Sequence, residues 1–214
     1  MSMLELRQVT KVYSQGAAEV HALREVSLDV GPGMMVAVMG PSGSGKSTLL
    51  TIADSLEEPS SGQVLVAGED LAAMSRNDQA RLRRQSIGYV FQDFNLLPGL
   101  TAAENAALPL ELDGVGARRA REAGLRVLDG LGLADRASNY PDQLSGALDS
   151  ANGEAVMRMI HTACRRGVAA VVVTHDAQLA AWADRVVFLR DGRLTGQTTR
   201  PPGPESLLMP GEIR

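Results

Sequence analysis

One short stretch of the sequence constrains the fold more than any other. Residues 40–48 read Gly-Pro-Ser-Gly-Ser-Gly-Lys-Ser-Thr, which matches the pattern of a loop whose backbone N–H groups surround nucleotide phosphates. An apolar run typical of a buried strand, 34–39, precedes it, and the segment 48–56 that follows is compatible with a helix. Unpaired amides and the positive end of the helix dipole converge at such a junction, so we expect an anion site there. The alternative, a Gly/Ser surface turn, does not explain these flanks.

The phosphate loop predicts specific contacts to ATP and Mg²⁺. We expect Lys46 to reach the terminal phosphates and the Ser47 hydroxyl to bind the metal ion. Of the 21 Lys and Arg residues only Lys11 and Lys46 are lysine, so an ammonium stands where a compact charge suits phosphate. The residues expected to contact the nucleotide phosphates are Gly40, Ser42, Gly43, Ser44, Gly45, Lys46, Ser47 and Thr48.

Length and composition indicate a globular protein of one domain with room for a subdomain. The 214 residues carry a net charge of −4, which gives no sign of nucleic-acid binding. No apolar run approaches the ~18–20 residues of a membrane span, and the first seven residues lack the features of a signal peptide. The single cysteine, Cys164, has no partner for an internal disulfide and lies on an apolar helical stripe, so we expect it to pack in a cytosolic protein.

The remaining sequence predicts alternating strands and helices. Thr101 and Glu104 form a capping box for a helix that we expect to stop near Pro109. The Asp191-Gly192 turn predicts a hairpin over 185–198, and 168–173 reads as a continuous buried strand. Further strands are expected at 4–13, 20–30, 62–68 and 87–92, further helices at 76–84, 117–128 and 154–165, and a loose tail at 200–214.

A longer phrase makes a family resemblance specific. Residues 88–98 read Gly-Tyr-Val-Phe-Gln-Asp-Phe-Asn-Leu-Leu-Pro, and 100–105 continue Leu-Thr-Ala-Ala-Glu-Asn. With the phosphate loop, this phrase resembles the ATP-binding subunits of ABC transporters, in the branch that serves lipoprotein release and macrolide-type efflux. The resemblance covers about residues 4–198. It implies an α/β P-loop NTPase fold with a mixed core sheet, an N-terminal antiparallel β-subdomain and an inserted helical subdomain at about 93–146, all within a domain of residues 1–199.

The resemblance also implies roles for individual residues. Tyr13 matches the aromatic residue that stacks on adenine, although a strand-end tyrosine is the ordinary reading of that residue alone. Gln92 matches the glutamine that contacts Mg²⁺ and the attacking water, and His175 the histidine that contacts the γ-phosphate. Asp149 matches a contact across a dimer of such subunits. By the same resemblance, the helical subdomain grips a membrane permease, and the subunit lies on the cytoplasmic face of the membrane.

The chain departs from the family pattern at one junction, 146/147. Leu144, Ser145 and Gly146 begin the family signature, but the chain then passes directly to the Ala-Leu-Asp-Ser segment that contains Asp149. The family places a signature helix and then a buried strand that ends in Asp-Glu (the Walker B strand) between these points, roughly 25–30 residues by usual element lengths. No Asp in this chain is followed by Glu, and neither 171–176 nor 186–191 offers a substitute.

The missing segment has chemical and structural consequences. The Asp supports Mg²⁺ and the Glu polarises the attacking water, so we expect ATP hydrolysis to be impaired. We also expect the core sheet to lack one strand beside the phosphate-loop strand, and the fold to be distorted there. Three readings remain open: a transporter ATPase subunit with a segment lost by gene decay, mis-assembly or design, a non-catalytic nucleotide-binding or regulatory subunit, and another P-loop enzyme such as a kinase or GTPase. The last fits least, because it explains neither the 91–105 phrase nor the absence of an Asn-Lys-x-Asp motif.

Overall fold

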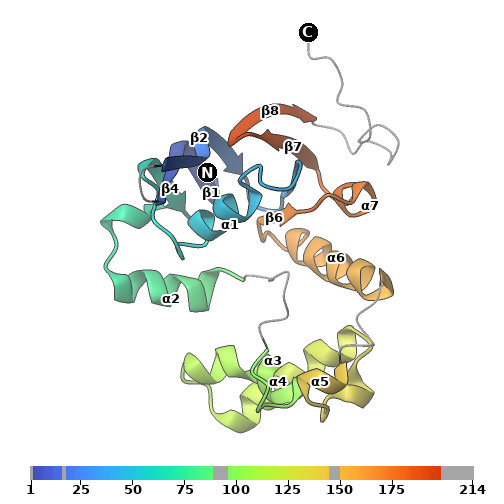
Figure 1. The fold of residues 1–214 in the computed structure, drawn as a ribbon. Helices are drawn as coiled ribbons and strands as arrows, with labels where there is room; N and C mark the ends of the chain where they lie inside the picture. Colours follow the sequence, from blue (N-terminus) through green and yellow to red (C-terminus); the bar gives the residue numbers. More distant parts are fainter. Residues whose placement is uncertain (1, 16–17, 89–95, 145–149, 199–214) are drawn as a thin grey trace. The chain divides into compact units, whose positions relative to one another are not determined.

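The computed structural model describes residues 2–15, 18–88, 96–144 and 150–198 and separates into two compact units (Figure 1). Unit 1 comprises Met1–Gln79 and Met157–Arg214, and unit 2 comprises Ala80–Val156. The expected limits of the domain, its helical insertion and its tail remain predictions. In the part of the chain that is described, no helix combines the length and apolar character needed to cross a membrane.

An antiparallel sheet forms the N-terminal part of unit 1. Its strands are β1 (Leu4–Gln15), β2 (Ala18–Val30), β4 (Ser61–Val66) and β5 (Glu69–Asp70), in the order β2-β1-β4-β5. The sequence alternates as a half-buried strand requires: Val26, Leu28 and Val30 are buried, whereas the residues between them are exposed. The 3₁₀ turn η1 (Leu71–Ala73) follows β5. The predicted antiparallel β-subdomain is therefore present.

The second sheet of unit 1 carries the phosphate loop. Its order is β6-β3-β7-β8, with β3 (Met35–Met39) parallel to both β6 (Ala170–Val173) and β7 (Arg185–Arg190). Strand β8 (Arg193–Thr198) pairs antiparallel with β7, which confirms the predicted hairpin. All five residues of β3 are buried, as expected for a parallel strand that is covered on both faces.

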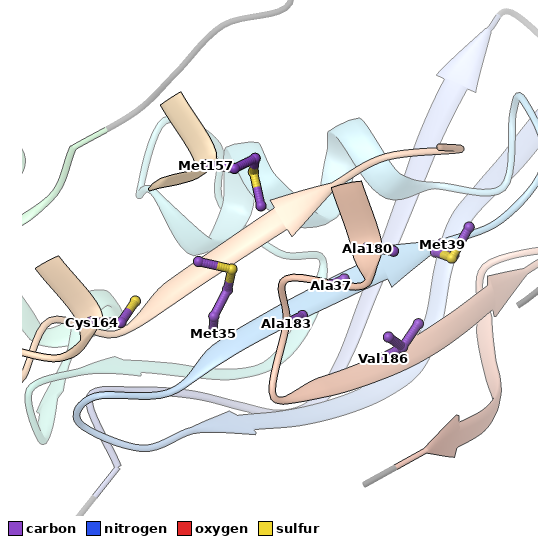
Figure 2. Close-up of a cluster of buried hydrophobic side chains, with 8 residues drawn as sticks. All are labelled: Met35, Ala37, Met39, Met157, Cys164, Ala180, Ala183 and Val186. Carbon is purple, nitrogen blue, oxygen red and sulfur yellow. The ribbon is translucent and has the colours of Figure 1, made fainter. Parts of the chain in front are cut away.

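A sulfur-rich apolar cluster covers one face of this sheet (Figure 2). Met35, Ala37 and Met39 of β3 share this cluster with Met157 and Cys164 of helix α6 (Ser150–Cys164). Ala180 of helix α7 (Ala177–Ala180), Ala183 and Val186 complete the cluster. Cys164 is 3% exposed, so the expectation that it packs in the core is confirmed, and burial raises the pKa of its thiol.

The remaining helices are α1 (Lys46–Ala53), α2 (Arg76–Ser86), α3 (Ala102–Leu112), α4 (Ala117–Gly130) and α5 (Pro141–Leu144), with the 3₁₀ turn η2 (Ala134–Arg136).

The predicted capping box of α3 is confirmed, because Thr101 and Glu104 bond each other's backbone N–H. The predicted stop at Pro109 is wrong. A proline removes only its own N–H, and the next turn still closes through the Asp113 N–H and the Pro109 carbonyl at 3.2 Å.

Strand β6 differs from the prediction in two respects. It begins at Ala170 rather than 168, and its residues are half-buried, with Val168 51% exposed just before it. The prediction that a strand is missing beside the phosphate-loop strand is wrong, because β3 has β6 and β7 as its two neighbours. Among the described strands, β6 instead forms one edge of the sheet. An edge strand keeps part of its surface in contact with solvent, which explains the exposure of this apolar run.

We expect the free edge of β6 to be visible in hydrogen exchange. Ala170 and Thr174 direct their N–H groups to the Met34 and Val38 carbonyls of the neighbouring strand segment, so the alternation of the ladder turns the Val171 and Val173 N–H groups outward. Their amides should exchange at least about tenfold faster than those of Val36 and Val38 in the central strand. Exchange followed by NMR at single residues measures this, and equal protection of both pairs would mean that the edge is covered.

Candidate nucleotide-binding site

The phosphate loop joins the carboxyl end of β3 to the first residue of α1. The helix begins at Lys46, two residues before the start expected from the sequence, with Gly45 as its N-cap and no side chain bonding the cap. The first intrahelical bond runs from the Leu49 N–H to the Gly45 carbonyl at 2.9 Å. The N–H groups of Lys46, Ser47 and Thr48 therefore lack intrahelical acceptors, and the positive end of the helix dipole coincides with them. Such an end favours an anion.

Two glycines of the loop are required by close backbone approaches. A Cβ atom at Gly40 would lie 2.0 Å from the Leu189 carbonyl oxygen of β7. A Cβ atom at Gly45 would lie 2.2 Å from the Ala22 carbonyl oxygen of β2, and Gly45 also has a left-handed φ of 102°. The loop is therefore held between strands of both sheets of unit 1, in a conformation that only glycine permits at these positions.

Lys46 holds its ammonium inside the loop. Its Nζ donates to the carbonyl oxygens of Gly40 at 2.8 Å and Pro41 at 2.7 Å, and lies 3.4 Å from Oγ of Ser44. Burial lowers the pKa of Lys46, because the charged form loses solvation. Among the described residues no carboxylate forms an ion pair with it, so neutral acceptors surround an uncompensated positive charge. An anionic phosphate would supply the missing charge.

The β7–β8 turn contacts the phosphate loop through a backbone hydrogen bond. Sequence reasoning did not identify this contact. The Gly192 N–H donates to the Ser44 carbonyl at 3.1 Å, and the Gly192 carbonyl accepts from the Arg24 N–H of β2 at 2.8 Å. Ser44 itself is 2% exposed. The Asp191-Gly192 dipeptide predicted a hairpin, but its contact with the loop depends on the pairing of strands that are distant in the sequence.

Tyr13 lies on β1 and is half-buried. Its hydroxyl donates to Oε2 of Glu57 at 2.6 Å, and the Lys11 ammonium is 5.2 Å from the centre of its ring. Burial, and then the Glu57 carboxylate, raise the pKa of Tyr13, whereas a hydrogen bond with Thr48 opposes them. The contact with Thr48 links Tyr13 to the last residue of the phosphate-loop pattern. Sequence reasoning did not identify Lys11 or Glu57 as parts of this arrangement.

His175 follows β6 at the carboxyl-terminal end of the parallel strands, the same end at which the phosphate loop follows β3. The parallel register pairs Val173 with Val38, and the Thr174 N–H donates to the Val38 carbonyl at 3.3 Å. His175 and Gly40 each lie two residues beyond this pair, at the carboxyl ends of adjacent strands, where ligands bind in parallel sheets. The side chain of His175 is exposed.

Asp176 and Asp191, the aspartates that follow His175 and strand β7, make other contacts. Oδ1 of Asp176 accepts from the Gln178 N–H at 2.7 Å and caps α7. Asp191 is in the hairpin turn with its side chain 93% exposed. Neither aspartate is followed by Glu, and no group of three His, Cys, Asp or Glu suited to a metal ion occurs within 2–15, 18–88, 96–144 and 150–198.

The other predicted site residues fall mainly outside the described ranges. Gln92, Ser145, Gly146 and Asp149 are in the segments 89–95 and 145–149, so their predicted roles are untested. Leu144 is described and is 7% exposed in a cluster of unit 2 with Ala102, Ala103 and Leu128. Its observed contacts are those of a core residue.

Curated relatives with similar sequences are macrolide export ATP-binding/permease proteins named MacB. The protein from Marinobacter nauticus is 37% identical over 92% of this chain and 34% of its own length. The protein from Escherichia coli K12 is 37% identical over 98% of this chain and 36% of its own length. This chain therefore spans about a third of the length of these relatives.

Solved structures with the same fold cover this chain almost fully. The ATP-binding cassette MJ0796, in a dimeric post-hydrolysis state with ADP and Pi, superimposes with a TM-score of 0.87 at 34% identity. The alignment covers 94% of this chain and 100% of that chain. A second dimeric structure of MJ0796, described as a bacterial ABC transporter cassette, gives a TM-score of 0.83. The family model for ABC transporters matches residues 23–160, and with the fold and phosphate loop in agreement, this chain belongs to the ABC transporter ATP-binding family.

Proposed function

We propose that this chain is the ATP-binding subunit of a MacB-like export system. The carrying observation is the Lys46 ammonium, which lies without a carboxylate partner inside a glycine-built loop at the start of α1. The names of the relatives give macrolides as the exported compounds, so the cargo proposed here is a macrolide-like compound. This chain spans about a third of the length of those relatives. ATP binding is the part of the proposal that unit 1 supports directly.

The nucleotide would contact four groups of residues. Tyr13 would lie beside the adenine, and Lys46 with the loop amides would bind the β- and γ-phosphates. Mg²⁺ binds through one or two protein oxygens with phosphates and waters, a role that suits the exposed Ser47 hydroxyl at the start of α1. When bound, the ion neutralises charge on the phosphates. Gln92 and His175 would lie near the γ-phosphate, with Gln92 also near the metal ion.

We propose further that this chain hydrolyses ATP poorly or not at all. The sequence has no Asp-Glu pair, and the described aspartates near the loop have other partners. The alignment with the E. coli relative spans 235 positions, whereas 98% of 214 residues is about 210, so about 25 positions have no counterpart here. That number supports a missing segment of the length expected at 146/147.

The proposed partners are a permease and a second nucleotide-binding subunit. The relatives combine ATP-binding and permease functions in their names, and MJ0796 forms a dimer with ADP and Pi. We propose that the helical insertion, about 93–146, contacts the permease on the cytoplasmic side of the membrane. Asp149 would contact the second subunit, and Ser145 and Gly146, with the buried Leu144, would be the remnant of the family signature.

A non-catalytic or regulatory subunit is the second candidate function. The absence of the Asp-Glu pair favours it, because such a subunit would bind ATP and leave hydrolysis to an intact partner. Mixing the two subunits separates this candidate from a decayed ATPase: only a regulatory subunit would raise the phosphate release of the intact partner.

Direct binding of ATP tests the proposed function. Isothermal titration of the folded chain with ATP, with and without Mg²⁺, should give saturable binding at one site per chain, because the phosphate loop is already formed around Lys46. Circular dichroism on the same sample establishes that the chain is folded. A folded sample that binds adenine nucleotides under neither condition would overturn the proposal.

A further inference from the structure

Lys11, the second of the two lysines, has no role in the proposed phosphate contacts, yet it is the centre of a connected polar cluster. Its ammonium is 3.0 Å from Oε1 of Glu57 and donates to the Glu58 carbonyl at 2.7 Å, and its side chain is only 14% exposed. The register of β1 against β2 shifts on both sides of Lys11. Such irregularities re-aim a side chain, and here the ammonium lies over the Tyr13 ring.

Glu57 connects this lysine to the tyrosine and to helix α1. One carboxylate oxygen bonds Lys11, and the other accepts the Tyr13 hydroxyl at 2.6 Å and lies 3.5 Å from Oγ1 of Thr51 on α1. Burial would raise the pKa of Glu57, but the hydrogen bonds and charge of its partners outweigh burial and lower it. The carboxylate is therefore held ionised among three donors, which makes the connection electrostatically strong.

The cluster restrains Tyr13 in two ways. The bond to Glu57 fixes the hydroxyl end of the ring, and the Lys11 ammonium is positioned over the ring for a cation–π contact. Thr51 is on the same helix that begins with Lys46, so the ring is tied to the element that carries the phosphate contacts. Lys11 and Glu57 thereby restrain the Tyr13 ring relative to α1.

We propose that Lys11 and Glu57 are positioning residues that orient Tyr13 for the nucleotide base. The inference rests on the proposed function, because it requires ATP to bind at the phosphate loop with its base beside Tyr13. It predicts that the two residues affect the affinity for the base and leave the affinity for the phosphates unchanged.

The test compares ATP with inorganic tripolyphosphate, which has no base, by titration calorimetry of the full chain. Glu57→Gln, Lys11→Met and Tyr13→Phe should each weaken ATP binding by about three- to tenfold, the scale of one hydrogen bond to a charged group. Tripolyphosphate binding should be unchanged. The double variant Glu57→Gln/Tyr13→Phe should lose no more than either single variant, because both remove the same bond.

Glu5→Gln is the matched control. It removes the same formal charge from β1, the strand that carries Lys11 and Tyr13, where Glu5 pairs with Arg7 at 2.8 Å in an exposed position, and should leave both affinities unchanged. Equal weakening of ATP and tripolyphosphate by Glu57→Gln would overturn the inference and assign the cluster a purely structural role, as would unchanged ATP affinity in all three variants. A wild-type chain that binds neither ligand would refute the proposed function itself.

Discussion

Lys46→Ala lowers the affinity for ATP by about 10- to 100-fold, the largest binding effect that we expect from any single substitution. Removing a charge-assisted hydrogen bond to an anion typically costs ~1.5–3 kcal/mol. The Lys46 ammonium has only neutral acceptors around it among the described residues, so bound phosphate would be its sole anionic partner. Calorimetric titration with ATP measures the change.

Arg118→Ala is the control for Lys46→Ala. It removes the same formal charge from α4, where the side chain is 91% exposed and 3.7 Å from Glu122, so ATP affinity should not change. The fold of the Lys46→Ala variant should persist, because the lysine contributes hydrogen bonds to loop carbonyls and no part of the apolar core. Equal affinity in Lys46→Ala and the unmodified chain would contradict the phosphate-loop assignment.

Local patterns predicted most of the elements of the fold. The apolar segment 20–30, the capping box at Thr101 and the Asp191-Gly192 turn each act within a few residues, and the strand, the cap and the hairpin that they predicted are confirmed. The errors occur where the conformational preference of one residue is outweighed by hydrogen bonds or strand pairing elsewhere in the fold. Pro109 was expected to end α3, but the loss of one N–H near a helix end is outweighed by the bonds that continue around it.

The two sheets depend on distant pairings, which sequence patterns do not specify. The apolar run at 168–173 predicted a strand, but its position at the edge follows from which strands neighbour β3. The prediction that a missing strand would lie beside the phosphate-loop strand is therefore wrong. The exposure of β6 follows from its place at the end of the strand order in the sheet, and the apolar residues of β6 alone do not predict it.

For the candidate site too, the local sequence predicted the loop itself but not the distant residues that contact it. The pattern at 40–48 indicated the loop, its lysine and its junction with a helix without any knowledge of the rest of the chain. The supports of the loop were not predictable: the Ala22 and Leu189 carbonyls and the Gly192 turn approach it only after both sheets form. The same holds for Glu57, which is 44 residues from Tyr13 in sequence.

We expect the chain to release phosphate from Mg·ATP no faster than its own Lys46→Ala variant. Loss of a general base alone typically costs ~10²–10⁴ in rate. Under the proposal above, the chain would also lack the aspartate that supports the metal ion, because no Asp in its sequence is followed by Glu. MJ0796, which the alignment covers completely, serves as the intact control under the same conditions. A rate equal to that of MJ0796 would show that another group supplies the base.

Restoring the segment that we propose to be absent tests the cause of the expected loss of hydrolysis. Insertion of the corresponding signature helix and Asp-Glu strand of a relative between Gly146 and Ala147 should raise phosphate release by at least about 100-fold, because the base and the metal-supporting carboxylate return together. The same insertion with its Glu changed to Gln is the matched control: it should restore the strand next to β6, and slow exchange at Val171 and Val173, without restoring hydrolysis. If both insertions protect these amides and neither hydrolyses ATP, the defect lies outside the missing segment. If the Gln version hydrolyses ATP as fast as the Glu version, the chemical role assigned to that glutamate is wrong.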